Sequence, residues 1–273
     1  MDRRLLARQL SAIENGEMQV DYVEGDVIAI TGPPGVGKSC ILDAILQRLA
    51  PEKKIAVLAV DPTSPLSGGA LLGDRIRLTV LDDKMKSDSI YFRSVATRSS
   101  SGSIPSIVRD LASHLIDNSF DLIFIETVGA GQSEIRCAAI ANRIVVVEGP
   151  ARGDGIQAEK AGLLELADLI VVNKSDLEGS DKVVNDLTIS LGLTTDPPPI
   201  IKTSTVNGEG LEELANLIPN LEVRNSSKRA RHRQQLVMAH ESILTQNPQF
   251  EAILDRMSEE GLALEDALRE LSE

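Results

Sequence analysis

Short runs of aliphatic residues, many of them β-branched, alternate along most of the chain with segments of helical or mixed polar character. The runs lie at residues 27–30, 55–60, 122–125, 144–147, 169–172 and 200–201. Each run is short and apolar throughout, which is typical of a strand buried on both faces of a parallel sheet. Strands that alternate with helices predict βαβ units. We therefore expect an α/β fold with a mainly parallel central sheet flanked by helices.

The two ends of the chain carry helical patterns without such runs. Apolar residues recur at helical spacing over residues 2–15 and again over 228–272, where breaks are expected near Pro248 and Gly261. A helical tail of this kind packs either on the central domain or on a partner subunit. We predict an N-terminal helical extension, a central α/β domain and a helical C-terminal tail, over residues 1–24, 25–223 and 224–273 respectively.

Charge narrows the range of possible partners. The chain has 28 Lys and Arg residues against 41 Asp and Glu residues, which gives a net charge of −13. An acidic surface repels phosphate backbones, so we expect no general nucleic-acid binding. The basic run at residues 228–233 is an exception, and we interpret it as a solvated helix face. Aromatic residues make up only 2% of the chain, so aliphatic side chains must fill the core.

Targeting and redox features favour a cytoplasmic protein. The N-terminal residues lack the apolar region of a secretory signal, and no stretch approaches 18 consecutive apolar residues. We therefore expect no membrane segment. Cys40 and Cys137 are isolated cysteines without CxxC spacing, which favours reduced thiols over a disulfide scaffold.

Residues 32–39 read Gly-Pro-Pro-Gly-Val-Gly-Lys-Ser and match the phosphate-loop pattern GxxxxGK[ST]. The pattern follows a predicted strand and opens a predicted helix, as a P-loop NTPase requires. Glycines let backbone N–H groups surround a phosphate, and the helix N-terminus adds positive potential. The Lys38 ammonium is expected at the β- and γ-phosphates and the Ser39 hydroxyl at Mg²⁺. The predicted nucleotide contacts in this loop are Gly35, Val36, Gly37, Lys38, Ser39 and Cys40.

Two acidic residues at strand ends are candidates for the magnesium site. Asp61 follows the run at 55–60, and Glu126 follows the run at 122–125. A carboxylate that ends a hydrophobic strand is typical of the Walker B arrangement. For Asp61 alone, a helix cap or a turn aspartate is an equally simple interpretation. Gly129, shortly after Glu126, can offer its N–H to a γ-phosphate.

Asn173-Lys174-Ser175-Asp176 follows the run at 169–172 and matches the NKxD guanine motif. The aspartate accepts from guanine N1–H and the 2-amino group, whereas adenine offers neither donor there. Ser204 and Thr205 follow the next predicted strand and could supply backbone contacts to guanine O6. The order of the motifs predicts GTP, rather than ATP, as the nucleotide.

Three longer segments resemble the MeaB/ArgK family of P-loop GTPases, which includes the chaperones of methylmalonyl-CoA mutase. Residues 60–77 are similar to the family's long switch segment. Residues 126–134 resemble its ETVGxGQSE switch II, and residues 153–162 resemble a third switch, usually GDELQxxKxG. The resemblance covers roughly residues 2–220, in order.

The resemblance implies a GTPase, commonly a homodimer, that binds a cobalamin-dependent acyl-CoA mutase. There it gates delivery of adenosylcobalamin and removal of damaged cofactor. By the same resemblance, the catalytic residues are Lys38, Glu126 and Asp74, and the metal ligands are Ser39, Asp61, Asp74 and Glu126. The residues that couple the nucleotide state to the partner are Arg77, Gln132, Asp154, Gln157 and Lys160.

The sequence also departs from the family pattern. Residues 98–104 replace a glycine-richer RGxLGG stretch, Gly155 replaces a Glu, and Thr205 replaces the Ala of the SA guanine motif. The tail after residue 223 does not match the family's dimerisation arm. These departures concern partner identity and dimer geometry rather than GTP binding. Gln132 follows the switch II glycine by three positions, so the residue that orients the attacking water stays open.

Three alternatives remain. A GTP-dependent nickel chaperone would need clustered thiolate or imidazole ligands, whereas His114, His232 and His240 are scattered. An ATP-using phosphotransferase linked to amino-acid transport would leave the NKxD motif without a purpose. A scaffold with an inactive nucleotide site is disfavoured because the phosphate-loop and Walker B residues are all present.

Overall fold

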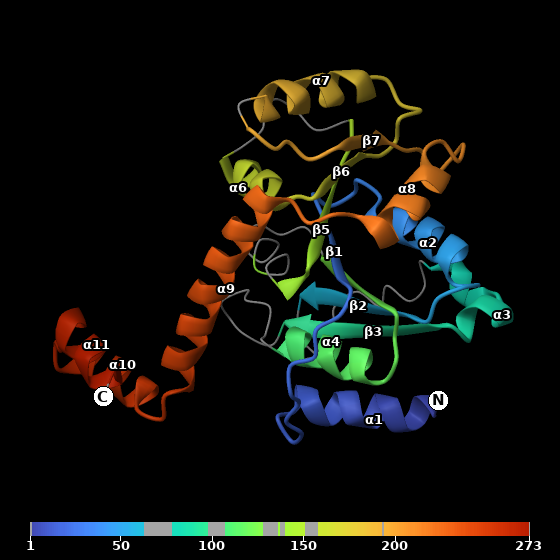
Figure 1. The fold of residues 1–273 in the computed structure, drawn as a ribbon. Coiled ribbons are helices and arrows are strands. Elements are labelled where there is room, and N and C mark those ends of the chain that lie inside the picture. Colours follow the sequence, from blue (N-terminus) through green and yellow to red (C-terminus); the bar gives the residue numbers. More distant parts are fainter. Residues whose placement is uncertain are drawn as a thin grey trace. The chain divides into compact units, whose positions relative to one another are not determined.

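The computed structural model describes residues 2–62, 78–97, 107–127, 136, 140–150, 158–192 and 194–272. The chain divides into two compact units, Met1–Arg231 and His232–Glu273. The larger unit contains the central sheet with its flanking helices, and the smaller unit is helical (Figure 1).

The larger unit is built on a seven-stranded sheet whose described strands are all parallel (Figure 1). The strand order is β3-β2-β4-β1-β5-β6-β7. In chain order the strands are β1 Val27–Thr31, β2 Ile55–Pro62, β3 Ile90–Thr97, β4 Leu122–Thr127, β5 Arg143–Glu148, β6 Leu169–Val172 and β7 Ile200–Lys202. The predicted fold class, a P-loop NTPase fold with a mainly parallel sheet, is confirmed.

The edge strand β3 is the one strand of the sheet that the apolar runs do not predict. Arg93 and Ser94 interrupt its hydrophobic sequence. The structure explains the interruption, because Arg93 donates to both carboxylate oxygens of Glu14, at 2.9 and 2.6 Å. A strand at a sheet edge accommodates a charged residue when a neighbouring element pairs it. Here the N-terminal helix α1 (Arg3–Glu14) supplies the partner.

Helices cover both faces of the sheet and bury two aliphatic clusters. One cluster joins the sheet to α1, α4 (Ile107–Asp117), α6 (Ala158–Leu166) and α7 (Ser180–Leu191). The other joins it to α2 (Lys38–Leu49), η2 (Thr79–Asp82), α8 (Leu211–Leu217) and η3 (Ile218–Asn220), while the short helix α3 spans Lys84–Ser87. The strands themselves are buried on both sides, which accounts for their continuous apolar runs.

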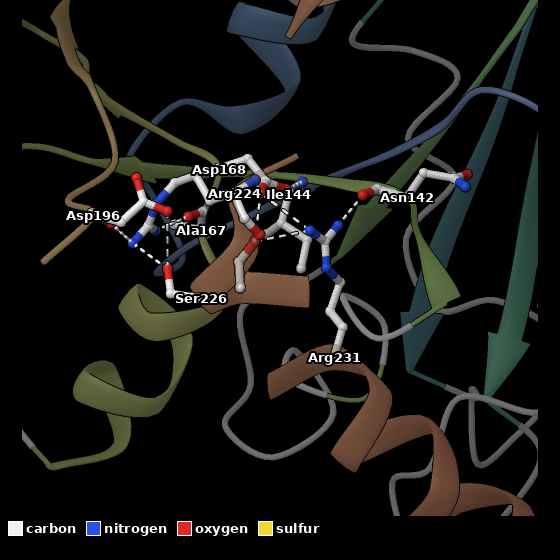
Figure 2. Close-up of polar contacts among 9 residues, drawn as sticks. Asn142, Ile144, Ala167, Asp168, Asp196, Arg224, Ser226 and Arg231 are labelled. Atoms are coloured by element: carbon white, nitrogen blue, oxygen red, sulfur yellow. Dashed lines mark hydrogen bonds and ion pairs between the residues drawn. The ribbon is translucent and has the colours of Figure 1, made fainter. Parts of the chain in front are cut away.

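A buried polar network holds the start of α9 (Asn225–Gln246) to the amino ends of β5 and β6 (Figure 2). The Asp168 carboxylate accepts from Ile144 N at 2.9 Å, Ser227 Oγ at 2.6 Å and Arg231 Nη2 at 3.1 Å. Arg231 also donates to the carbonyl of Asn142. Our interpretation of residues 228–233 as a solvated face is therefore wrong for Arg231, whose side chain is only 4% exposed. The lysine and arginines around it are exposed.

The smaller unit contains the rest of α9, followed by α10 (Phe250–Glu259) and α11 (Leu264–Ser272). Arg256 of α10 pairs with Glu270 of α11 at 2.5 Å, and Ile253 and Ala267 are buried. The helices break close to Pro248 and Gly261, so the predicted helical tail is confirmed. Over the residues that the structure describes, no helix has the length and apolar character needed to cross a membrane.

Candidate nucleotide-binding site

The phosphate loop connects β1 to α2 at the carboxyl end of the central strand. Two of its glycines are required by close approach. A Cβ at Gly32, where φ is +140°, would lie 2.0 Å from the carbonyl oxygen of Val147. A Cβ at Gly37, where φ is +97°, would lie 2.4 Å from Asn173 Nδ2. Gly37 is also the N-cap of α2 and places no side chain over the helix start, so the loop presents a helix N-terminus suited to an anion.

Lys38 lies inside this loop and is buried. Its Nζ donates to the carbonyl oxygen of Gly32 at 2.6 Å and to that of Pro33 at 3.1 Å. These two carbonyls fix the ammonium within the turn of the loop. A phosphate held by the loop would therefore meet a preplaced positive charge.

Ser39 and Glu126 meet at the end of the sheet. The Ser39 hydroxyl donates to Glu126 Oε1 at 2.6 Å. The sheet register explains the contact, because Ile30, just before the phosphate loop, pairs with Glu126. A hydroxyl and a carboxylate are hard oxygen donors of the kind that Mg²⁺ takes, so the donor set fits a magnesium ion. Asp61 belongs to the neighbouring strand β2, just beyond the pairing of Val60 with Thr127, and only its backbone is described.

The base motif is bonded directly to the phosphate loop. Asn173, which is 1% exposed, donates from Nδ2 to the carbonyl oxygen of Val36 at 2.8 Å. Lys174 adopts a left-handed conformation with φ of 60°, and its Nζ donates to the carbonyl oxygen of Gly35 at 2.8 Å. A positive φ is uncommon outside glycine and occurs preferentially at functional turns. The structure thus brings the two predicted motifs into a single site.

Asp176 lies at the exposed end of the base motif. The hydroxyl of Ser204, which is fully buried, donates to Asp176 Oδ1. The same hydroxyl accepts from the backbone N–H of Val206 at 3.3 Å and of Asn207 at 3.4 Å. Sequence reasoning assigned Ser204 only a backbone role, and its side-chain contact with Asp176 was missed. The neighbouring Thr205 is partly buried in the same turn.

Several predicted residues lie outside the described residues or are described only in part. Cys40 is exposed at the start of α2. Lys160 belongs to α6, and only its backbone is described. The predicted residues outside the described ranges are Asp74, Arg77, Gly129, Gln132, Asp154 and Gln157.

Sequence comparison places this chain in a known family. Residues 17–260 match the model of the family described as methylmalonyl Co-A mutase-associated GTPase MeaB. The chain belongs to this family. The chain is accordingly a GTPase. This activity agrees with the phosphate loop and the guanine motif, which the structure brings together. The MeaB-family assignment also confirms the resemblance carried by the three longer segments.

Individual relatives agree with the assignment. A Pyrococcus horikoshii protein named as a GTPase is 40% identical to this MeaB-family chain over 231 residues, which cover 78% of this chain and 72% of the relative. A fused isobutyryl-CoA mutase from Cupriavidus metallidurans is 33% identical over 200 residues, which cover 68% of this chain and 18% of the relative. The crystal structure of a LAO/AO transport system kinase shares the fold, with a TM-score of 0.61 at 21% identity, covering 100% of this chain and 98% of that one.

Proposed function

We propose that this MeaB-family GTPase is a chaperone that gates delivery of adenosylcobalamin to a cobalamin-dependent acyl-CoA mutase, such as methylmalonyl-CoA mutase, and protects that enzyme. The fused relative supports the choice of partner, because there a region similar to this chain is part of a polypeptide named as a mutase. The family match favours this partner over the nickel-chaperone and transport-kinase alternatives.

The proposal for nucleotide binding rests on one observation above all. Asn173 and Lys174 of the base motif hydrogen-bond to Val36 and Gly35 of the phosphate loop, at 2.8 Å in each case. One nucleotide could therefore contact both motifs at once. In the proposal the phosphates lie in the loop around Lys38, and Asp176 accepts from the guanine N1–H and 2-amino groups. Ser204 and Thr205 line the base on the side of the neighbouring turn.

The proposal includes Mg²⁺ held by Ser39 and Glu126, with Asp61 and Asp74 as further ligands. When bound, the ion would neutralise charge that develops on the phosphate oxygens during hydrolysis. Glu126 fits this role, because the residue is only 6% exposed and its carboxylate lies within hydrogen-bond distance of the Ser39 hydroxyl. Lys38, held by the carbonyl oxygens of Gly32 and Pro33, would contact the phosphates in the loop.

The remaining expectations complete the proposal. Arg77, Gln132, Asp154, Gln157 and Lys160 would report the nucleotide state to the mutase. Loops close to a γ-phosphate are the usual elements that change shape when it leaves. We propose a homodimer, supported by the exposed apolar side chains of Leu236, Val237 and Ile243 along α9. We also propose a cytoplasmic location, which rests on the isolated cysteines of the sequence.

The base assignment is tested with Asp176→Asn. The amide loses an acceptor for guanine but gains a donor for the C2 carbonyl of xanthine. We expect the affinity for GTP to fall and the affinity for xanthosine triphosphate to rise, as measured by titration calorimetry. Unchanged GTP binding in this variant would show that the base site lies elsewhere.

The partner is tested by measuring GTP hydrolysis with and without a purified adenosylcobalamin-dependent acyl-CoA mutase. We expect stimulation of hydrolysis by the mutase and different binding of the mutase in the GTP-analogue and GDP states. By linkage, a partner that prefers one nucleotide state must also change the nucleotide affinity reciprocally. Lys160→Ala should reduce the stimulation and leave GTP binding nearly intact. Absence of both stimulation and nucleotide-dependent binding would contradict the chaperone proposal and leave the GTPase assignment unaffected.

A further inference from the structure

Ser175 occupies the variable position of the base motif, where the motif itself demands no particular residue. In this chain its hydroxyl donates to Glu209 Oε2 at 2.7 Å. Glu209 lies in the turn between β7 and α8, which also carries Ser204. The side chain at the variable position therefore bonds to the second loop of the proposed base site.

The contact closes a ring of hydrogen bonds. Ser204 donates from its backbone N–H to the carbonyl oxygen of Glu209 at 3.0 Å, and from its hydroxyl to Asp176. Asp176 is covalently next to Ser175, whose hydroxyl returns to Glu209. A further bond, from Ser175 N to the carbonyl oxygen of Thr203 at 2.9 Å, runs between the same two loops. The loop with Asp176 is thus held to the loop with Ser204 both at Asp176 itself and at the preceding residue.

The backbone of the turn fixes where Glu209 lies. Its N–H donates to Asn207 Oδ1 at 3.0 Å, and the neighbouring Gly208 donates to the carbonyl oxygen of Ser204 at 3.0 Å. Gly210 has φ of +69°, and a Cβ there would lie 2.1 Å from the carbonyl oxygen of Lys202. These contacts hold the backbone on both sides of Glu209, with glycine at the position where a side chain would not fit.

We propose that Glu209 is a positioning residue for base selection, whose carboxylate acts through Ser175 on the neighbouring Asp176 carboxylate, while its backbone carbonyl oxygen holds Ser204. The inference rests on the proposed role of Asp176 in reading guanine. Hydrogen bonds weaken steeply when their angle departs from linearity. An acceptor that must meet two donors of one base therefore depends on its orientation. The Ser204 hydroxyl donates one hydrogen bond to Oδ1 of Asp176. A carboxylate can accept several hydrogen bonds, so Asp176 can still accept from the base.

The test compares the affinities for GTP and for inosine triphosphate, which lacks the 2-amino group but keeps N1–H. Glu209→Ala should lower the ratio of the two affinities by about threefold to tenfold, the range for one net hydrogen bond. Glu209→Gln keeps a side-chain acceptor without the charge and should preserve the ratio. Ser175→Ala should reproduce the effect of Glu209→Ala, and the double variant should add little more.

Asp181→Ala is the matched control. Its exposed carboxylate accepts from Lys202 at 2.7 Å, close to the same turn but outside the ring. This hydrogen bond raises the pKa of Lys202, with a smaller contribution from Glu209. Removing the Asp181 carboxylate changes the local charge as Glu209→Ala does, and it should leave the GTP-to-inosine ratio unchanged.

Two results would overturn the inference. The first is that Glu209→Ala and Ser175→Ala leave the ratio of GTP affinity to inosine triphosphate affinity unchanged, although Asp176→Asn still shifts the nucleotide preference to xanthosine triphosphate. The second is an equal fall of both affinities, which indicates a general loss of structure in the turn. If Asp176→Asn itself leaves GTP binding unchanged, the proposed base site is wrong. The result then contradicts the proposed function rather than the role of Glu209 alone.

Discussion

The two ends of the parallel sheet use polar groups in opposite ways. At the carboxyl ends of the strands, Lys38 at the start of α2 and Asp176 on the loop after β6 lie where the proposed nucleotide would bind. At the amino ends, Asp168 is completely buried and accepts hydrogen bonds from Ile144 of β5 and from three residues of the segment 224–231 (Figure 2). The first arrangement is suited to binding and the second to holding the fold.

Burial explains the difference in energetic terms. A buried carboxylate is costly unless it is paired and hydrogen-bonded, and Asp168 meets both conditions. Burial lowers the pKa of Arg231, while the Asp168 carboxylate opposes that shift. The cost is smaller for Asp176 at the nucleotide end, because that carboxylate is exposed to solvent. A substitution at Asp176 is therefore expected to change ligand affinity with little effect on stability, whereas a substitution at Asp168 is expected to destabilise the fold.

The largest effect is expected for Asp168→Ala. The substitution leaves Arg231 buried without its carboxylate, and breaking such a pair costs about 3–5 kcal/mol of unfolding free energy. Urea denaturation followed by circular dichroism measures the loss. Asp181→Ala, which removes an exposed carboxylate, should leave the denaturation midpoint unchanged. A stability loss of the same size in both variants would show that burial is not the cause.

Lys38→Ala should have the next largest effect, on binding rather than on folding. Loss of a charged donor to phosphate oxygens should weaken GTP and GDP binding by about 10- to 100-fold. Calorimetric titration with each nucleotide measures the change. The nucleotide-free variant should keep a denaturation midpoint close to that of the parent protein. A large loss of stability instead would mean that Lys38 serves the fold as Asp168 does.

The smallest effect concerns pH and involves neither end of the sheet. His114 of α4 is buried, and its Nε2 lies 3.4 Å from Gln9 Oε1 and 3.3 Å from Asn118 Nδ2. Burial lowers the pKa of His114, and the Asp117 carboxylate opposes this only in part. The unfolded chain therefore binds a proton more readily than the folded one.

The stability that neutral His114 contributes is fully present above the unfolded pKa, about 6.5, and is lost as the pH falls below it. Denaturation at pH 7.5 and pH 5.5 measures the dependence. His114→Gln should reduce the difference between the two pH values. An unchanged difference in that variant would assign the acid sensitivity to other groups.

Sequence patterns predicted those parts of the molecule whose structure depends on residues that are close together in the sequence. The phosphate loop is recognisable because Gly32 and Gly37 meet backbone or side-chain atoms that leave no space for a Cβ. The six apolar runs became strands because both faces of the sheet are covered by helices. The NKxD motif lies beside the phosphate loop because β6 and β1, which these motifs follow, are parallel strands separated only by β5.

Contacts between distant segments could not be predicted in the same way. Arg93 and Glu14 are 79 positions apart, and nothing in the local pattern at β3 indicates that its charge is paired. Arg231 looked like one of several exposed basic residues, although its partner Asp168 is 63 positions away. Glu209 was overlooked for the same reason, because its contact with Ser175 links two loops.

The anchoring of α9 has a consequence for how this protein could have diversified. Arg231 is the last residue before the boundary between the two units, and it completes the buried network around Asp168. A recombination event beyond that position would exchange the tail without removing a group from the network. The GTPase unit could thus acquire a different C-terminal segment through gene rearrangement and still keep the buried network around Asp168.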